Sequence, residues 1–247
     1  MQNSVSGKVI IIGGITGGIG SNLASQLHSS GATVSGFARN PETTQGPHGS
    51  IAPCDATDPS QLEAYFDAII AEQGPIDGYA HALGSIFIKP AHLTSPEDWH
   101  LTLQQNLTSA FYALRALTKR MQSAGKGSLV FFSSVAAQTG ISNHEAIAAA
   151  KGGLEAMVRS AAATYASRGL RINAIAPTLT DTPLAKPLLG SEQMRQHSCK
   201  MHPLGQIGDA SDIASLAAWL LSDSAKMVTG QTYVVDGGLA STVAKTR

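Results

Sequence analysis

The clearest candidates for a binding function are the glycines of the segment 14–20, which reads Gly-Ile-Thr-Gly-Gly-Ile-Gly. This segment lies between an apolar run at 8–12 and a helical pattern that begins at Gly20. Absent side chains let a backbone approach a pyrophosphate closely, and a helix N-terminus supplies N–H donors and a partial positive charge. A tight turn that only packs helix on strand is the alternative, and a P-loop is excluded because no Gly-Lys-Ser/Thr follows. We therefore predict that a dinucleotide binds at Gly14, Thr16, Gly18, Ile19 and Gly20.

The end of the second predicted strand, at 32–38, indicates which dinucleotide binds. Where an acidic residue would hydrogen-bond an unmodified ribose, the chain has Ala38 followed by Arg39. The missing carboxylate and the added cation favour the 2′-phosphate of NADP over NAD. Asp55, just after the third predicted strand, is placed to accept a hydrogen bond from the adenine amino group. A solvated surface arginine and a turn aspartate are the structural alternatives at these two positions.

Composition excludes several other kinds of partner. The 247-residue chain has 17 basic and 17 acidic side chains, so it lacks the net positive charge that draws proteins to nucleic acid or anionic lipid. Its apolar runs are far shorter than the ~20 residues of a membrane span, and residues 1–7 do not form a signal segment. We expect a cytoplasmic protein that acts on a small molecule. Cys54 and Cys199 cannot by themselves form a disulfide framework or a four-ligand zinc site, so no metal is expected.

Strand and helix patterns alternate along the whole chain. The run at 8–12 is apolar and β-branched, which is typical of a strand covered on both faces of a parallel sheet. No low-complexity stretch or break in composition marks a linker. The order predicts an α/β fold over residues 1–247: a single doubly wound parallel sheet with helices on both faces, Rossmann-like. Further strands are expected near 51–54, 77–83, 128–133, 170–176 and 232–235, and helices at 59–72, 104–122, 143–167 and 209–221.

Two segments in the second half of the chain carry more specific expectations. Asn143 is a candidate N-cap for the long helix at 143–167. The proline-containing segment 183–203 interrupts the alternation and is expected to hold a short helix and to act as a lid or specificity loop. His197 and His202 flank Cys199 there, but without carboxylate support they make a poor metal site, and a solvated loop is the favoured interpretation.

Over essentially its whole length the chain resembles a classical short-chain dehydrogenase/reductase of the 3-oxoacyl-carrier-protein-reductase type. The resemblance implies a Rossmann-like subunit, usually dimeric or tetrameric, that moves hydride between a nicotinamide and a carbonyl or alcohol carbon. Gly13, Thr178 and His81-Ala82 depart from the residues common in the family, which are threonine, glycine and paired asparagines. The matching motifs, in the family's order and spacing, are the glycine segment, Asp55, His81-Ala-Leu-Gly84, Asn106, Ser133-Ser134, Lys151, Pro177 and Thr229 to Gly238.

The resemblance also implies roles for single residues. Ser134 would orient the substrate carbonyl, Lys151 would hold the ribose, and Asn106 would act through its backbone or a water relay. Thr182 would contact the nicotinamide carboxamide. The structural alternatives are a loop hydroxyl at Ser134, a ribose-binding cation without proton transfer at Lys151, a satisfied buried amide at Asn106 and simple capping at Thr182. The cofactor contacts implied beyond the glycine segment, Arg39 and Asp55 are Ala82, Gly84, Lys151, Pro177 and Thr182.

The family's proton donor, a tyrosine four residues before the lysine, is missing. Counting back from Lys151 and forward from Ser134 both lead to Ile147, which has no titratable atom. His144, seven residues before Lys151, has the spacing of the tyrosine in the related enoyl-carrier-protein reductases. A regular helix from Asn143 would place it on one face with Ile147 and Lys151, but seven residues rise ~10.5 Å, which is long for an imidazole to span. A polar first-turn residue is the alternative at His144.

Three functions remain open from the sequence. The first is an atypical NADP(H)-dependent oxidoreductase that reduces a ketone, quinone or 3-oxoacyl-like carbonyl without the tyrosine acid. The second is a catalytically silent NADP-binding subunit or sensor, and the third is a lyase or isomerase on the same scaffold. The small residues of the helix at 143–167 suit packing against a second copy, so a homo-oligomer, dimer or tetramer, is expected.

Overall fold

The main sheet runs through the middle of the molecule, with its strands in the order β10-β7-β6-β5-β1-β2-β4-β3. The computed structural model describes residues 5–42, 45–46 and 49–242. Within those residues every pairing in this sheet is parallel except that of β3 with β4. The strands are β1 (Val9–Gly13), β2 (Thr33–Ala38), β3 (Gln45–Gly46), β4 (Gly49–Pro53), β5 (Gly78–His81), β6 (Gly127–Phe132), β7 (Leu170–Pro177) and β10 (Thr232–Val235).

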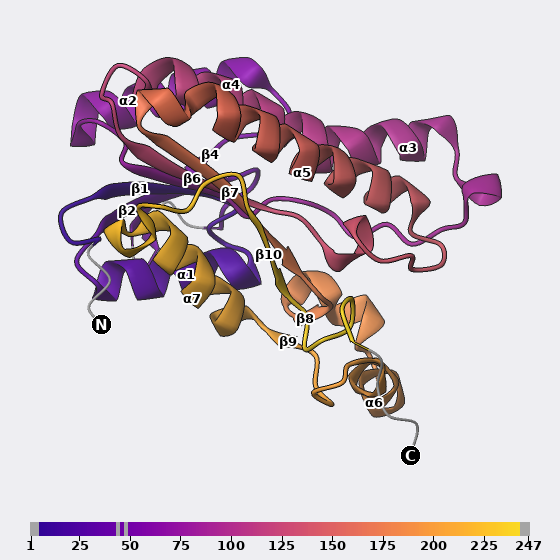
Figure 1. The fold of residues 1–247 in the computed structure, drawn as a ribbon. Helices are drawn as coiled ribbons and strands as arrows, with labels where there is room; N and C mark the ends of the chain where they lie inside the picture. Colours follow the sequence, from indigo (N-terminus) through magenta and orange to yellow (C-terminus); the bar gives the residue numbers. More distant parts are fainter. Residues whose placement is uncertain (1–4, 43–44, 47–48, 243–247) are drawn as a thin grey trace.

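Helices cover both faces of the sheet (Figure 1). One face carries α1 (Gly18–Ser29) and α7 (Ala210–Leu221), which pack against each other. The other carries α2 (Pro59–Gln73), α4 (Ser109–Met121) and α5 (Glu145–Tyr165), with α3 (Pro96–Leu103) beside α5. The doubly wound parallel α/β fold predicted from the sequence is therefore confirmed.

Alternation along β1 explains why a continuous apolar run forms the central strand. Val9 and Ile11 belong to the hydrophobic core on one side of the sheet, and Ile10 and Ile12 belong to the core on the other side. Successive side chains of a strand point to opposite faces, so a strand covered twice needs apolar residues at every position. The chain winds outward from β1 in both directions, which places a topological switch point between β1 and β5.

The helix expected at 104–122 begins earlier than predicted. Ser95 is the N-cap of α3, its hydroxyl accepts a hydrogen bond from the Asp98 amide, and Pro96 occupies the first helical position. This Ser-Pro start is a sequence signal that the apolar periodicity does not contain. A π-helical segment, Gln104–Thr108, then joins α3 to α4.

The start of α5 also differs from the expectation. Its N-cap is His144, without a side-chain capping hydrogen bond, and Asn143 precedes it with a φ of 64°. Asparagine tolerates this left-handed conformation better than most residues, so Asn143 turns the chain into the helix instead of capping it. The prediction that Asn143 is the N-cap was wrong.

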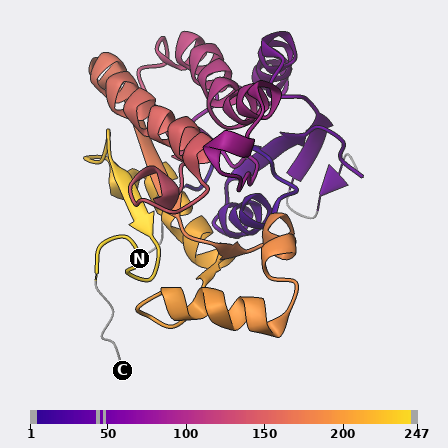
Figure 2. The ribbon, with the colours of Figure 1, turned by 90° about the vertical axis from the view of Figure 1, so that its right-hand side faces the viewer.

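The segment 183–203 forms a small separate lobe (Figure 2). It contains a 3-10 helix, Pro183–Leu188, and the short helix α6 (Glu192–Met201), as expected for this segment. A two-stranded sheet of β8 (Thr180–Asp181) and β9 (Gly208–Asp209) joins the lobe to the rest of the fold. None of the helices in the described part of the chain has the length and apolar character needed to cross a membrane.

Candidate active site

A cavity of about 410 Å³ lies at the carboxyl ends of the central strands. Its floor comes from the residues that directly follow β5, β6 and β7, and one wall comes from the lobe at 183–203. Ligands of doubly wound sheets bind at this edge. Most of the lining is apolar. The polar and titratable side chains that line it are those of Ser85, Asn106, Ser133, Ser134, His144, Lys151, Thr178, Thr180, Thr182, Ser198 and His202.

The glycine segment forms a tight loop between β1 and α1. Gly14 has a φ of 81°, and a Cβ there would lie 2.5 Å from the Ala82 carbonyl oxygen. A Cβ at Gly18 would lie 2.6 Å from Cγ2 of Thr182. Glycine is therefore required for the loop to pack against the segments that follow β5 and β7.

The N-terminus of α1 suits an anion. Its N-cap is Gly17, which offers no side-chain acceptor, and the first turn contains no acidic residue. The first amides of a helix need acceptors, and the helix dipole favours negative charge there. The residues present thus fit the diphosphate of a dinucleotide.

Arg39 and Asp55, which are expected near the ribose and the adenine, differ in their side-chain contacts. Arg39 is exposed and directly follows β2, next to buried Ala38. Asp55 follows β4, and its Oδ1 accepts hydrogen bonds from the amide and the hydroxyl of Thr57, at 2.9 and 2.8 Å. Asp55 is thus a turn aspartate in this structure, as the structural alternative anticipated.

Ser134, Ile147 and Lys151 all line the cavity. Ser134 caps a 3-10 turn, and its Oγ accepts from the Ala136 amide at 3.2 Å, so its hydroxyl proton is left to donate to a ligand. Ile147 lies one helical turn before Lys151 on α5 and is 7% exposed.

The ammonium group of Lys151 is buried and donates a 2.8 Å hydrogen bond to the Phe132 carbonyl. Burial lowers the pKa of Lys151 from 10.5 to about 8. A Cβ at Gly84 would lie 3.3 Å from Nζ of Lys151 and 2.8 Å from Oδ1 of Asn106. Glycine at position 84 is what lets these two side chains approach the strand end.

Asn106 lies in the π-helical segment and is buried. Its Oδ1 accepts from the Ser85 amide, and its Nδ2 donates to the Ser85 hydroxyl and the Thr102 carbonyl. The side chain therefore acts as a satisfied buried amide that fixes the loop after β5. π-bulges are frequent at functional sites, which agrees with the position of Asn106 on the cavity wall.

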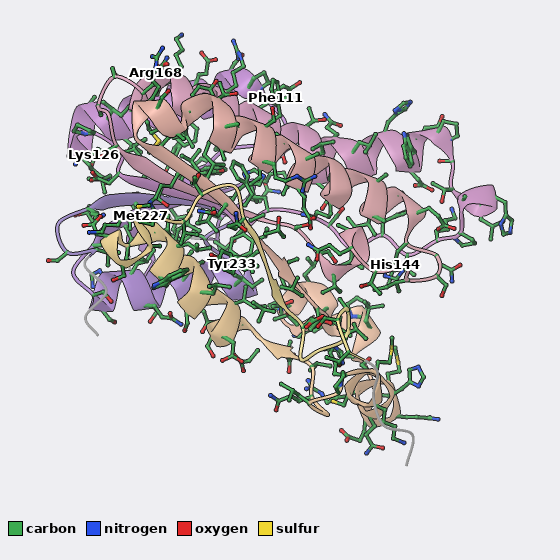
Figure 3. The ribbon with its side chains drawn as sticks, in the orientation of Figure 1. Phe111, Lys126, His144, Arg168, Met227 and Tyr233 are labelled. Carbon is green, nitrogen blue, oxygen red and sulfur yellow. The ribbon has the colours of Figure 1, made fainter. Side chains whose placement is uncertain are left out.

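His144 lies at the N-terminal end of α5 (Figure 3) and is half-buried at the cavity. Its Nδ1 lies 2.7 Å from the Ser142 carbonyl oxygen, which can only accept, so Nδ1 carries a proton. His144 is the N-cap of α5, its carbonyl accepts from the Ala148 amide, and it lines the same cavity as Ile147 and Lys151. The helix thus begins after His144 and not at Asn143, but the three residues face one cavity, as the sequence predicted.

Thr182 is the N-cap residue of the 3-10 helix Pro183–Leu188, but its side chain makes no capping hydrogen bond. Its hydroxyl instead donates to the Thr180 carbonyl at 3.3 Å. Simple capping by the side chain does not account for this residue. Thr182 packs against the start of α1, where Gly18 leaves room for it.

The sequence interpretation missed a polar pair in the cavity wall. The Thr178 hydroxyl lies 2.6 Å from Nε2 of His202, and both residues are buried. The interpretation of His202 as part of a solvated loop was wrong, because its ring turns inward from the end of α6. The available signal was Thr178 itself, which stands where the family the chain resembles usually has glycine. Among the described residues, no group of three or more His, Cys, Asp or Glu side chains could hold a metal ion.

Comparisons with known proteins agree with this architecture. The family described as Enoyl-(Acyl carrier protein) reductase matches residues 14–240. D-threitol dehydrogenase of Mycolicibacterium smegmatis is 33% identical over 244 residues, which cover 95% of this chain and 93% of the relative. The 3-oxoacyl-[acyl-carrier-protein] reductase of Escherichia coli is 31% identical over 239 residues, covering 94% and 97%.

Solved structures give the same result. A gluconate 5-dehydrogenase from Burkholderia cenocepacia in complex with NADP and tartrate has a TM-score of 0.92 at 28% identity and covers 98% of both chains. The aldohexose dehydrogenase of Thermoplasma acidophilum also has a TM-score of 0.92 at 28% identity, covering 99% of this chain and 98% of its own. The fold and the cavity thus define a Rossmann-like oxidoreductase scaffold. The chain belongs to the classical short-chain dehydrogenase/reductase family.

Proposed function

We propose that this protein is an atypical NADP(H)-dependent oxidoreductase that reduces a carbonyl group on a largely apolar small molecule. The observation that carries the proposal is the cavity itself, which is lined by Ser134, by Lys151 and by Ile19 of the loop at 14–20. When bound, NADPH supplies a hydride. The chain supplies the hydrogen bonds and charges that bind and orient the reactants.

The preference for NADP(H) rests on Arg39. The exposed guanidinium of Arg39, directly after β2, can pair with a 2′-phosphate. Ala38 beside it has no carboxylate to bind the hydroxyls of an unmodified ribose. The Burkholderia cenocepacia relative, whose structure contains NADP, supports the choice by analogy.

Ser134 and Lys151 have distinct roles in this proposal. The Ser134 hydroxyl donates a hydrogen bond to the carbonyl oxygen of the substrate. Its oxygen accepts from the Ala136 amide, and its proton stays available for this donation. The Lys151 ammonium holds the ribose and adds positive charge beneath the site, where a low dielectric strengthens its effect. Ile147 cannot exchange a proton, so the acid must come from another group.

The cavity walls indicate the kind of molecule that is reduced. Apolar side chains face it from the loop after β5, from α5 and from the lobe at 183–203, so binding gains free energy by burying hydrocarbon. This favours a ketone, quinone or 3-oxoacyl-like compound with an apolar body over a sugar or polyol. The apolar lining residues include Ile86, Phe87, Ile88, Ile141, Ile147, Leu184, Leu188 and Met201.

The substitution at Ile147 favours a second candidate, a catalytically silent NADP-binding subunit or sensor. The scaffold could also serve a lyase or isomerase that needs no phenol. We further propose that the protein is a cytoplasmic homo-oligomer. Phe111 is 48% exposed on α4 (Figure 3), and α5 has the small exposed residues Ala149 and Ala156. An exposed aromatic ring and small residues on a helix surface suit close packing of a second copy.

Calorimetry and stopped-flow absorbance together test the proposal. We expect NADPH to bind more tightly than NADH, and Arg39→Ala to weaken NADPH binding by about tenfold or more while NADH binding changes little. Mixing the NADPH complex with apolar ketones and quinones should produce a loss of NADPH absorbance. Tight NADPH binding without turnover of any carbonyl would support the silent subunit, and no binding of either dinucleotide would defeat the proposal.

A further inference from the structure

Thr178 and His202 form a hydrogen-bonded pair across the cavity wall. The Thr178 Oγ1 to His202 Nε2 distance is 2.6 Å, and the residues are 8% and 4% exposed. The other ring nitrogen, Nδ1, lies 2.8 Å from the Ser198 carbonyl oxygen. Both residues line the cavity that also contains Ser134 and Ile147.

The partners of His202 fix its tautomer. A backbone carbonyl only accepts hydrogen bonds, so Nδ1 carries the proton that points to Ser198. In the neutral ring Nε2 is therefore the acceptor, and the Thr178 hydroxyl donates to it. Unlike His144, whose Nδ1 is held in the same way at the half-buried start of α5, His202 directs its free nitrogen to a hydroxyl.

The same two partners also satisfy the hydrogen bonds of the protonated ring. In the imidazolium form both nitrogens donate, and the Ser198 carbonyl and the Thr178 oxygen can both accept. The Thr178 hydroxyl proton is then free to donate into the cavity. The pair can thus hold or release one proton without leaving a buried polar group unpaired, which is what an acid–base couple requires.

The backbone holds both members in place. Thr178 directly follows β7, where its amide donates to the Val235 carbonyl and its own carbonyl accepts from the Thr180 hydroxyl. His202 ends α6, and its carbonyl accepts from the Gly205 amide. A couple built on a strand end and a helix end needs little reorganisation to act.

We propose that Thr178 and His202 are the acid–base couple of this site and take over the proton transfer that Ile147 cannot perform. As the carbonyl carbon receives a hydride, its oxygen takes the proton of the Thr178 hydroxyl. The Thr178 oxygen takes a proton from Nε2 of the His202 imidazolium, which becomes neutral and regains its proton from water between turnovers. Alcohol oxidation runs the same transfers backwards. Thr178 is the catalytic residue, and His202 acts through it.

This inference rests on the proposed reductase function. The other titratable groups that line the cavity, His144 and Lys151, are the competing donors. Lys151 already gives a hydrogen bond to the Phe132 carbonyl, and His144 lies at the half-buried N-terminal end of α5. No other titratable side chain lines the cavity within the described residues.

Single-turnover reduction by preloaded NADPH tests the couple. We expect Thr178→Val, which keeps the shape and removes the hydroxyl, to slow hydride transfer by about 10²-fold while the Kd for NADPH is unchanged. Thr178→Ser should retain the rate to within a few fold. His197→Ala, an exposed histidine on the same helix, is the matched control and should match the wild type.

His202 needs a readout that a merely structural residue would not move. His202→Gly should lose rate to the same extent as Thr178→Val, and added imidazole should restore much of it. His202→Gln keeps a polar partner for Thr178 but cannot relay a proton, so it should remain slow. The double variant Thr178→Val/His202→Gln should be no slower than either single variant, because the two residues form one unit.

A measurement without turnover checks the hydrogen bond itself. In ¹⁵N spectra of the cofactor-free protein, recorded at a pH high enough for the ring to be neutral, the single proton of His202 should be on Nδ1, and Thr178→Val should shift the Nε2 resonance. If the wild type is active and the Thr178→Val and His202→Gly variants reduce the carbonyl as fast as the wild type, the couple is overturned. It is also overturned if, among the variants, only His144→Ala loses rate. A wild type that binds NADPH and reduces no carbonyl overturns the proposed function together with the couple.

Discussion

Ile147 and Lys151 lie one helical turn apart on α5 and line the same cavity, but only Lys151 can carry a charge or a proton. The isoleucine is 7% exposed and contributes only hydrocarbon to the cavity wall. The site thus combines a buried cation with an apolar wall.

A phenol introduced at position 147 should raise the rate of carbonyl reduction. We expect Ile147→Tyr to speed hydride transfer by about tenfold or more, because a general acid is added four residues before Lys151. Ile147→Phe is the matched control, since it adds the ring without the hydroxyl. Single-turnover stopped-flow absorbance of NADPH measures both. Equal rates in the two variants would show that the surrounding cavity no longer positions a phenol for proton transfer.

The buried ammonium of Lys151 should make stability rise with pH in the alkaline range. Burial lowers its pKa from 10.5 to about 8, so between these values the unfolded chain binds more protons than the folded one. The unfolding free energy therefore rises from pH 8 to 10.5, and the burial penalty is fully present below pH 8. Lys151→Met removes that penalty.

The gain in unfolding free energy from Lys151→Met should be largest near pH 7 and shrink by on the order of 3 kcal/mol by pH 10.5. Urea unfolding followed by circular dichroism measures it. Lys200→Met on α6 is the control for removal of an exposed lysine. If the gain in unfolding free energy does not change between pH 7 and 10.5, Lys151 does not lose its proton in the folded protein over that pH range.

His81 should make the fold sensitive to acid. Its Nδ1 lies 2.6 Å from the Tyr79 hydroxyl and its Nε2 lies 3.1 Å from the Ser109 hydroxyl, which in turn donates to the Gln105 carbonyl. Burial, and secondly the charge of Lys151, lower the pKa of His81 to about 3. Between pH 3 and 6.5 the unfolded chain therefore binds more protons, so the unfolding free energy falls as pH drops below 6.5.

Replacing His81 should flatten this dependence. The wild type should lose about 2 kcal/mol more than His81→Asn between pH 6.5 and 5, as judged by urea unfolding. Tyr79→Phe is the control, because it removes the hydroxyl partner and keeps the buried imidazole, so its pH slope should resemble that of the wild type. Parallel slopes in the wild type and His81→Asn would contradict a neutral buried ring.

Two glycines with similar backbone angles should respond differently to alanine. Gly14 and Gly7 have φ values of 81° and 74°, but a Cβ at Gly14 would lie 2.5 Å from the Ala82 carbonyl oxygen, while one at Gly7 meets nothing within 4 Å. Gly7→Ala should cost about 1 kcal/mol for the left-handed angle alone and leave NADPH binding intact.

Gly14→Ala should cost more and weaken NADPH binding at least tenfold, because the loop must move away from the end of β5. Thermal unfolding and calorimetry measure the two effects. If Gly14→Ala binds NADPH with the affinity of the wild type, the loop is not the dinucleotide site.

Local patterns determined most of the fold. The apolar β-branched run at 8–12 predicted a central parallel strand because both of its faces must be buried, and the structure confirms this. Helix boundaries differ from the prediction where two local signals compete. The helix around Asn106 begins at Pro96 because a Ser-Pro cap outweighs the polar residues that follow it, and Asn143 adopts a left-handed turn instead of capping α5.

The sequence by itself determined the order of strands and helices, the glycine loop at 14–20 and the absence of a phenol at position 147. All three depend on neighbours in the chain or on fixed spacing along one helix. Only the tertiary structure brought Thr178 to His202, which is 24 residues further along the chain, because their contact depends on how the lobe at 183–203 folds back against the end of β7. Side-chain partners at such separations follow from packing, which no local pattern encodes.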